Sequence, residues 1–121
     1  MKKTVLAMAL ALAPLTAAAA MPVSTFLAKA EALQKKGPMA LFSSDIGVLK
    51  KEMKTSGAQI KAERTAAMKA GRKPDFCPPA KASMTSDELL NHLRAIPAAQ
   101  RGMPFKAAYK SFLVRKFPCP A

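Results

Sequence analysis

Residues 84–97, MTSDELLNHLRAIP, contain the most explicit helix start in the chain. Thr85 and Glu88 have the spacing of a capping box, in which each side chain accepts a hydrogen bond from the other residue's backbone N–H. Met84 and Leu89 lie where a hydrophobic staple would place them. Apolar side chains then recur at helical spacing up to a closing proline, at Leu89, Leu93, Ile96 and Pro97. The segment therefore predicts an amphipathic helix that begins after Thr85 and ends before the proline.

The C-terminal segment 104–119, PFKAAYKSFLVRKFPC, predicts a second amphipathic helix. Pro104 suits the first helical position, because a proline has no N–H that would need a partner there. The apolar face of this helix comprises Phe105, Ala108, Tyr109, Phe112 and Leu113. If the two helices run antiparallel, they form a helical hairpin.

Two further helices are predicted before this hairpin. Ser24 is a suitable N-cap for a first helix of about 12 residues, which Gly37-Pro38 ends. Met39–Phe42 is a short apolar turn, and Ser43-Ser44-Asp45 forms a capping cluster for the next helix.

The long helix that follows has one apolar stripe, which contains Ile46, Leu49, Met53, Ile60 and Ala67. Gly71 and Pro74 end it. Ser56-Gly57 is its weak point, because glycine is unfavourable inside a helix, and a kink or a break into two helices stays open there. No segment alternates as a half-buried strand does. We therefore expect an all-α domain of four or five helices that extends from residue 21 to residue 121.

The first 20 residues have the three parts of a cleavable secretory signal. Lys2 and Lys3 provide the positive start, Val5–Leu15 the apolar segment, and Thr16–Ala20 the small residues before cleavage. The apolar segment is far shorter than the ~20 residues that span a bilayer. We expect cleavage after Ala20, export to a bacterial periplasm, and no stable membrane insertion.

The formal net charge is +13, and removal of Lys2 and Lys3 lowers it to +11, because all seven carboxylates follow residue 20. This excess predicts attraction to an anionic partner, such as an acidic protein surface, the cell-wall polymer or lipid headgroups. Nucleic acid is the least expected of these partners for an exported protein.

Cys77 and Cys119 are the only two cysteines, and in an oxidising compartment they predict one structural disulfide. The bridge would close a loop of roughly 43 residues, which the chain-entropy relation values at about 4 kcal/mol. It would also join the two ends of the C-terminal helical hairpin. A redox or metal site would require Cys-x-x-Cys spacing or clustered histidines, and the chain has neither.

Little in the sequence indicates a catalytic or metal-binding site. His92 is the only histidine, and its position beside an apolar stripe is typical of a partly buried surface residue. Glu52 and Glu63 share one side of the long helix about 16 Å apart, too far for paired acid–base chemistry, and resemble ordinary solvated residues. The six methionines after residue 20 are dispersed, which indicates core packing. We predict no enzyme, no cofactor and no metal.

Lys50, Lys54 and Lys61 fall on one shoulder of the apolar stripe of the long helix. A solvated charged face explains this row, and a basic ridge for an acidic protein partner is the functional alternative. A membrane-surface helix is less favoured, because the opposite shoulder is acidic.

The C-terminal half contains a series of short motifs: Phe76-Cys77-Pro78-Pro79, Met84-Thr85, Ile96-Pro97, Arg101, Ala107-Ala108 and Phe117-Pro118-Cys119. In these motifs it resembles the Rap/Tai family, which are periplasmic immunity proteins of type VI secretion systems. Residues 21–75 depart from the pattern, because they contain neither the cysteine pair nor the tyrosine that members usually have there.

The resemblance implies a helical protein that binds a peptidoglycan amidase effector and blocks its cleft. Because the matched positions are structural, no binding residue is transferred. A periplasmic stress or chaperone-like protein and a basic cell-wall-associated protein are the alternatives, and a homodimer stays open.

Overall fold

The computed structural model describes residues 20–120, which form four α-helices and two short 3-10 helices with no β-strand among them. In chain order these are α1 (Val23–Lys36), η1 (Gly37–Phe42), α2 (Ser44–Lys69), α3 (Ser86–Arg94), η2 (Ala98–Gln100) and α4 (Phe105–Lys116). The prediction of an all-α fold with four or five helices is confirmed. Except for Ala20, the predicted signal peptide lies outside the described residues.

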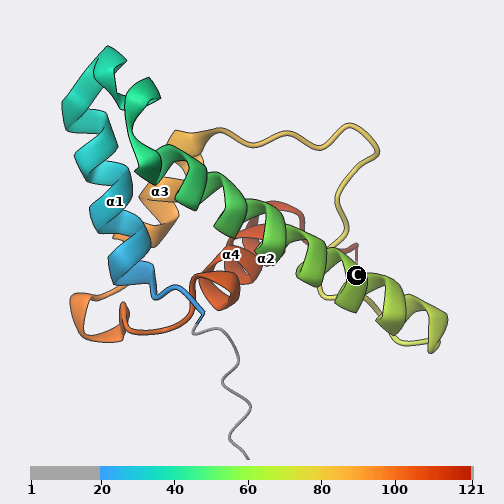
Figure 1. Ribbon diagram of the computed structural model, residues 1–121. Coiled ribbons are helices and arrows are strands. Elements are labelled where there is room, and N and C mark those ends of the chain that lie inside the picture. Colours follow the sequence, from blue (N-terminus) through green and yellow to red (C-terminus); the bar gives the residue numbers. More distant parts are fainter. Residues whose placement is uncertain (1–19, 121) are drawn as a thin grey trace, which may run out of the picture.

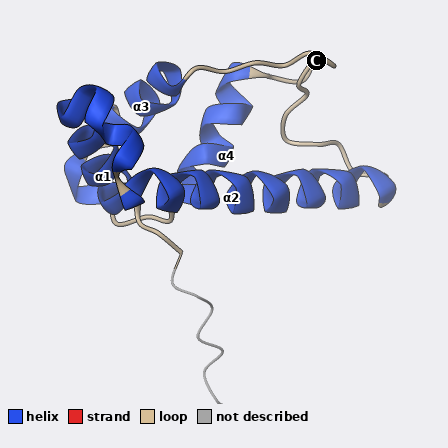
Figure 2. Cartoon of the chain, turned by 45° about the horizontal axis from the view of Figure 1, so that its top comes forward, coloured by secondary structure: helices blue, strands red, loops and turns tan. Residues whose placement is uncertain are grey.

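The long helix α2 spans the length of the molecule (Figure 1). α1 contacts its N-terminal half and α4 contacts its middle, while α3 packs on α1 and α4. The C-terminal end of α2 extends beyond the other helices, as Figure 2 shows. An extended connection, residues 70–85, then returns from this end to the start of α3.

The core lies where α1, α3 and α4 meet the first half of α2. Phe26 of α1 and Phe105 of α4 stack with ring centroids 4.0 Å apart, and both rings are buried. Leu49 of α2 and Leu93 of α3 belong to the same buried cluster. All four helices therefore contribute apolar side chains to one core.

The start of α1 differs from the prediction that Ser24 is its N-cap. α1 begins at Val23 with Pro22 at the N-cap, and no side chain in the described part of the chain caps it. The N–H groups of Val23 and Ser24 instead donate to the carbonyls of Met103 and Arg101, each at 2.9 Å. The connection between α3 and α4 thus supplies acceptors for N–H groups that a helix start leaves without partners.

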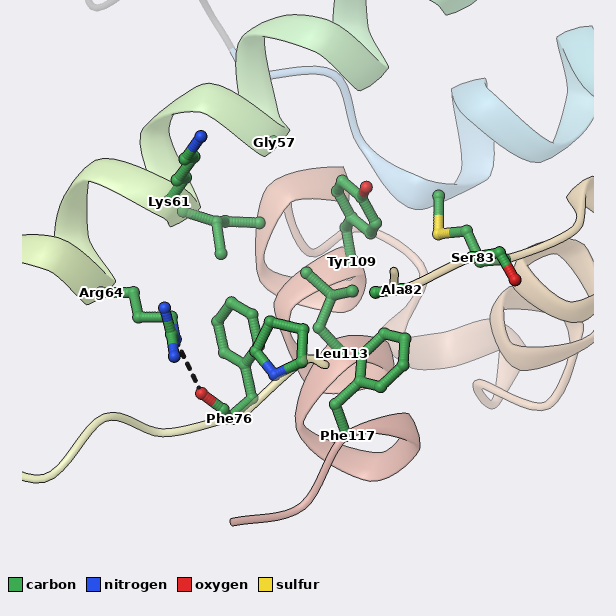
Figure 3. A pocket seen from close by; sticks show the side chains of 12 residues that line it. Gly57, Lys61, Arg64, Phe76, Ala82, Ser83, Tyr109, Leu113 and Phe117 are labelled. Atoms are coloured by element: carbon green, nitrogen blue, oxygen red, sulfur yellow. Dashed lines mark hydrogen bonds between the residues drawn. The ribbon is translucent and has the colours of Figure 1, made fainter. Parts of the chain in front are cut away.

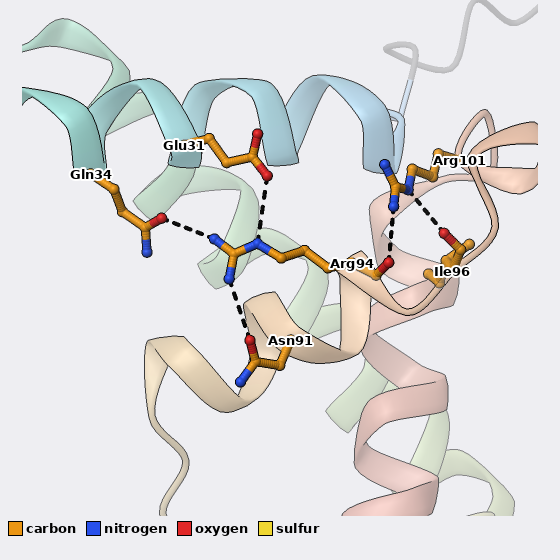
Figure 4. A network of polar contacts seen from close by, with 6 residues as sticks. All are labelled: Glu31, Gln34, Asn91, Arg94, Ile96 and Arg101. Atoms are coloured by element: carbon orange, nitrogen blue, oxygen red, sulfur yellow. Dashed lines mark hydrogen bonds and ion pairs between the residues drawn. The ribbon is translucent and has the colours of Figure 1, made fainter.

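The predicted capping box of α3 is confirmed. The backbone N–H of Thr85 donates to Glu88 Oε2 at 2.7 Å, and the N–H of Glu88 donates to Thr85 Oγ1 at 3.1 Å. At the other end of α3, the Arg101 guanidinium donates to the carbonyls of Arg94 and Ile96, each at 2.9 Å (Figure 4). A side chain from outside the helix therefore satisfies carbonyls that lack a helical partner.

α2 is continuous through Ser56-Gly57, where a break had stayed open. Ser56 is only 3% exposed, and a Cβ on Gly57 would lie 3.6 Å from the ring of Tyr109. The two small residues thus lie where α2 packs against α4, which explains why the helix passes through a locally unfavourable sequence.

The C-terminal helical hairpin and its disulfide are both confirmed. α4 begins at Phe105, so Pro104 is its N-cap and not its first helical residue. Lys116, at the end of α4, pairs with Glu88 near the start of α3, so the two helices run antiparallel. Cys77 and Cys119 are bonded, with Cα atoms 4.8 Å apart, and the Cys77 N–H donates to the carbonyl of Phe117 at 2.8 Å.

Candidate functional site

Two apolar hollows lie along α2 and share one lining residue, Met84. The larger, which we name the α1–α3 groove, has a volume of about 650 Å³. Its lining comprises Phe26, Ala30, Leu33, Gln34, Leu49, Lys50, Met53, Lys54, Met84, Thr85, Ser86, Leu89 and Leu90. Most of these side chains are apolar, and the groove lies directly over the core.

The smaller hollow, which we name the α2–α4 pocket, has a volume of about 340 Å³ and lies between the middle of α2, α4 and residues 76–84 (Figure 3). Tyr109, Leu113 and Phe117 line it from the α4 side. Arg64 Nε donates to the carbonyl of Phe76 at 2.9 Å, which links α2 to the connection. Burial raises the pKa of the Tyr109 hydroxyl above its usual value of 10.0.

The predicted lysine row lies beside both hollows. Lys50 and Lys54 line the α1–α3 groove, and Lys61 lines the α2–α4 pocket. All three residues are exposed. Within residues 20–120, none of them forms an ion pair with a carboxylate. The row therefore combines unneutralised positive charge with adjacent apolar surface.

The described carboxylates are largely neutralised by other basic residues. Five ion pairs join elements that are distant in the sequence: Lys29–Asp45, Arg94–Glu31, Lys106–Glu63, Lys110–Asp75 and Lys116–Glu88. Hydrogen bonding to Lys110 holds the pKa of Asp75 below its usual range, and Lys116 does the same for Glu88. Because so few carboxylates remain, most of the positive excess is available to a partner.

Glu52 and Glu63 have side-chain partners that the sequence did not indicate, although Glu63 is exposed as expected. Glu63 pairs with Lys106 of α4, and Glu52 is half-buried, with its Oε1 3.5 Å from Ser56 Oγ. Their helical spacing could not reveal these partners, because α4 supplies one of them.

His92 is partly buried, as predicted, and its Nε2 lies 2.9 Å from Ser111 Oγ. The Ser111 hydroxyl donates its proton to the carbonyl of Ala108 at 2.7 Å, so it accepts from the histidine N–H. Burial, followed by the positive charge of Arg115, lowers the pKa of His92 below 6.5. In this arrangement the histidine does not receive the serine proton, as a general base would.

Residues 20–120 bring together no group of three His, Cys, Asp or Glu side chains that could hold a metal ion. None of the described helices is both long and apolar enough to cross a membrane. Four methionines, Met21, Met53, Met84 and Met103, pack against the core as predicted. For Met39 and Met68 that prediction is wrong, because Met39 is 65% exposed and Met68 is 49% exposed.

Sequence reasoning identified the lysine row but missed the two hollows beside it. Their walls come from α1, α2, α3, α4 and the extended connection, and Met84 was interpreted only as part of a hydrophobic staple. Comparison of the chain with protein-family models, curated proteins and solved structures gave no match.

Proposed function

We propose that this chain is an exported, non-enzymatic binding protein of the immunity type. It would bind a peptidoglycan amidase effector in the bacterial periplasm and cover the cleft of that enzyme. The proposal combines the signal-like N-terminus, the resemblance of the C-terminal half to Rap/Tai proteins, and the surface along α2.

The observation that supports it best is the position of Lys50, Lys54 and Lys61 at the α1–α3 groove and the α2–α4 pocket. Protein interfaces typically have an apolar centre and a polar rim. An apolar hollow flanked by lysines that have no carboxylate partner within residues 20–120 therefore suits a partner segment with apolar side chains and acidic flanks. Such a complex would inhibit by steric occlusion, for which no catalytic group is needed.

The direct test is protection of cells against an amidase effector encoded beside this gene. We expect periplasmic expression of the chain to prevent lysis and the purified chain to bind the effector with one site per molecule. A chain that neither binds nor protects against that effector would refute the immunity role.

A charge-reversal variant tests the assigned surface. We expect K50E/K54E/K61E to weaken effector binding at least tenfold, mainly through slower association, because rim charges steer the encounter. The matched control is K51E/K69E/K73E, which changes the net charge equally at exposed residues of which none lines either hollow. Equal losses of affinity in both variants would show that only the net charge affects effector binding. That result would exclude the surface along α2 as the binding site.

Two other roles predict different results. A chaperone-like protein would suppress the aggregation of unrelated unfolded proteins, while a cell-wall-associated protein would pellet with purified sacculi and be released by salt. Either result, together with no effector binding, would favour that alternative.

A further inference from the structure

The turn between α1 and α2 presents large apolar side chains to solvent. Met39, Leu41 and Phe42 of η1 are 65%, 77% and 84% exposed. A 3-10 helix has three residues per turn, so Met39 and Phe42 lie on the same edge of η1. The turn is a convex corner of the molecule, remote from the C-terminal end (Figure 1). We name residues 37–42 the η1 tip.

Two lysines precede the η1 tip, and the sequence next to the tip contains no acidic residue. Lys35 and Lys36 end α1 and are exposed, and Lys36 Nζ donates to Ser43 Oγ at 3.4 Å, which places that ammonium beside the tip. Residues 32–44 contain no carboxylate. The next acidic residue, Asp45, is paired with Lys29 at 3.0 Å.

The backbone at both ends of the tip is satisfied locally. The N–H of Gly37 donates to the carbonyl of Gln34, and the N–H of Ser43 donates to that of Ala40. Residue 38 is a proline and has no N–H. The tip can therefore enter an apolar environment with a smaller penalty for unpaired backbone groups than an open loop would incur.

We propose that the η1 tip is a membrane-contact site that inserts Met39, Leu41 and Phe42 into the surface of a bilayer containing anionic phospholipid. The flanking lysines would contact the headgroups, as in peripheral proteins that combine apolar insertion with a basic patch. This contact is peripheral and independent of the surface proposed above for the effector.

A bilayer suits the tip better than a protein does. A stable protein interface buries roughly 800 Å² on each partner, which three projecting side chains do not supply. A second copy of the chain is disfavoured, because two tips would repel each other and the α1–α3 groove is itself flanked by Lys50 and Lys54.

The chain contains no tryptophan, so a single Phe42→Trp substitution gives a fluorophore that reports on the tip alone. We expect its emission to shift to the blue when the exported protein meets vesicles of phosphatidylcholine and phosphatidylglycerol. High salt should reverse the shift, and vesicles of phosphatidylcholine alone should cause none. Met68→Trp, at an exposed position near the far end of α2, is the matched control and should show no shift.

Adding K35E/K36E to the Phe42→Trp protein should reduce partitioning to anionic vesicles more than tenfold, because each lysine near such a surface contributes about a factor of five. Circular dichroism and the melting temperature establish that each variant is folded. The proposal is overturned if Phe42→Trp does not respond to vesicles, if Met68→Trp responds equally, or if the tip responds only to the effector. The effector-binding test with K50E/K54E/K61E succeeds or fails separately.

Discussion

At the scale of single residues, the pKa of His92 depends on its surroundings in the α3–α4 hairpin. Burial and Arg115 both disfavour its protonated form, so its pKa in the folded chain lies below the 6.5 of an unperturbed histidine. The folded chain therefore binds fewer protons at this site than the unfolded chain does.

We expect the contribution of His92 to stability to be complete above about pH 6.5 and to decrease as the pH falls toward the folded-state pKa. Because this is the only histidine, its ring proton signal can be titrated by NMR without assignment. His92→Gln keeps an N–H donor near Ser111 and should remove this part of the pH dependence of the unfolding free energy. A titration midpoint at or above 6.5 would contradict the prediction.

At the scale of secondary-structure elements, Gly57 lies at the contact between α2 and α4, which leaves room for a methyl group at this position. A Cβ on Gly57 would meet the Tyr109 ring at 3.6 Å, which is an ordinary van der Waals contact. We expect Gly57→Ala to raise the free energy of unfolding by about 0.5–1 kcal/mol, because glycine is that much less favourable than alanine inside a helix.

Denaturant unfolding measures this gain, and Gly71→Ala is the contrasting variant. Gly71 follows the end of α2 with a φ of 74°, a conformation that costs an alanine about 1 kcal/mol or more. Gly71→Ala should therefore destabilise. If Gly57→Ala were also destabilising, the packing of α2 on Tyr109 would have to be closer than described.

The sequence predicts best the elements whose signals are local. The capping box of Thr85 and Glu88 places the start of α3 correctly. Pro104 and the apolar stripe place the start of α4 to within one residue. The predicted start of α1 was wrong, because the backbone carbonyls of residues 101 and 103 replace a side-chain cap. The continuity of α2 was undecided, because it depends on packing against α4.

The candidate site could likewise be predicted only where its signals are local. Helical spacing was enough to place Lys50, Lys54 and Lys61 on one side of a helix. The hollows beside them could not be predicted, because their walls come from four helices and a connection that share no local pattern. The η1 tip was recognised as apolar, but its exposure depends on what the rest of the chain leaves uncovered.

At the scale of the whole molecule, the disulfide stabilises a domain with a modest core. It joins the connection after α2 to the segment after α4, and the two cysteines have a sequence separation of 42. We expect Cys119→Ser to lower the free energy of unfolding by about 4 kcal/mol, because the unfolded chain loses its cross-link.

Thermal unfolding with and without a reductant checks this expectation. The reductant should lower the melting temperature of the wild type to near that of Cys119→Ser and leave the variant unchanged. A wild-type melting temperature that is insensitive to complete reduction would contradict a stabilising bridge.

The hydrogen bonds at the start of α1 also join segments that are far apart in the sequence. Val23 and Ser24 find their acceptors in residues that are synthesised near the end of the chain, and the N–H of Phe105 returns to the carbonyl of Met21 at 2.7 Å. Forming these contacts requires closure of a loop that contains most of the domain, which slows folding relative to a bundle held by local contacts. A chain interrupted before residue 101 lacks both acceptors, so the N–H groups at the start of α1 would lose these partners.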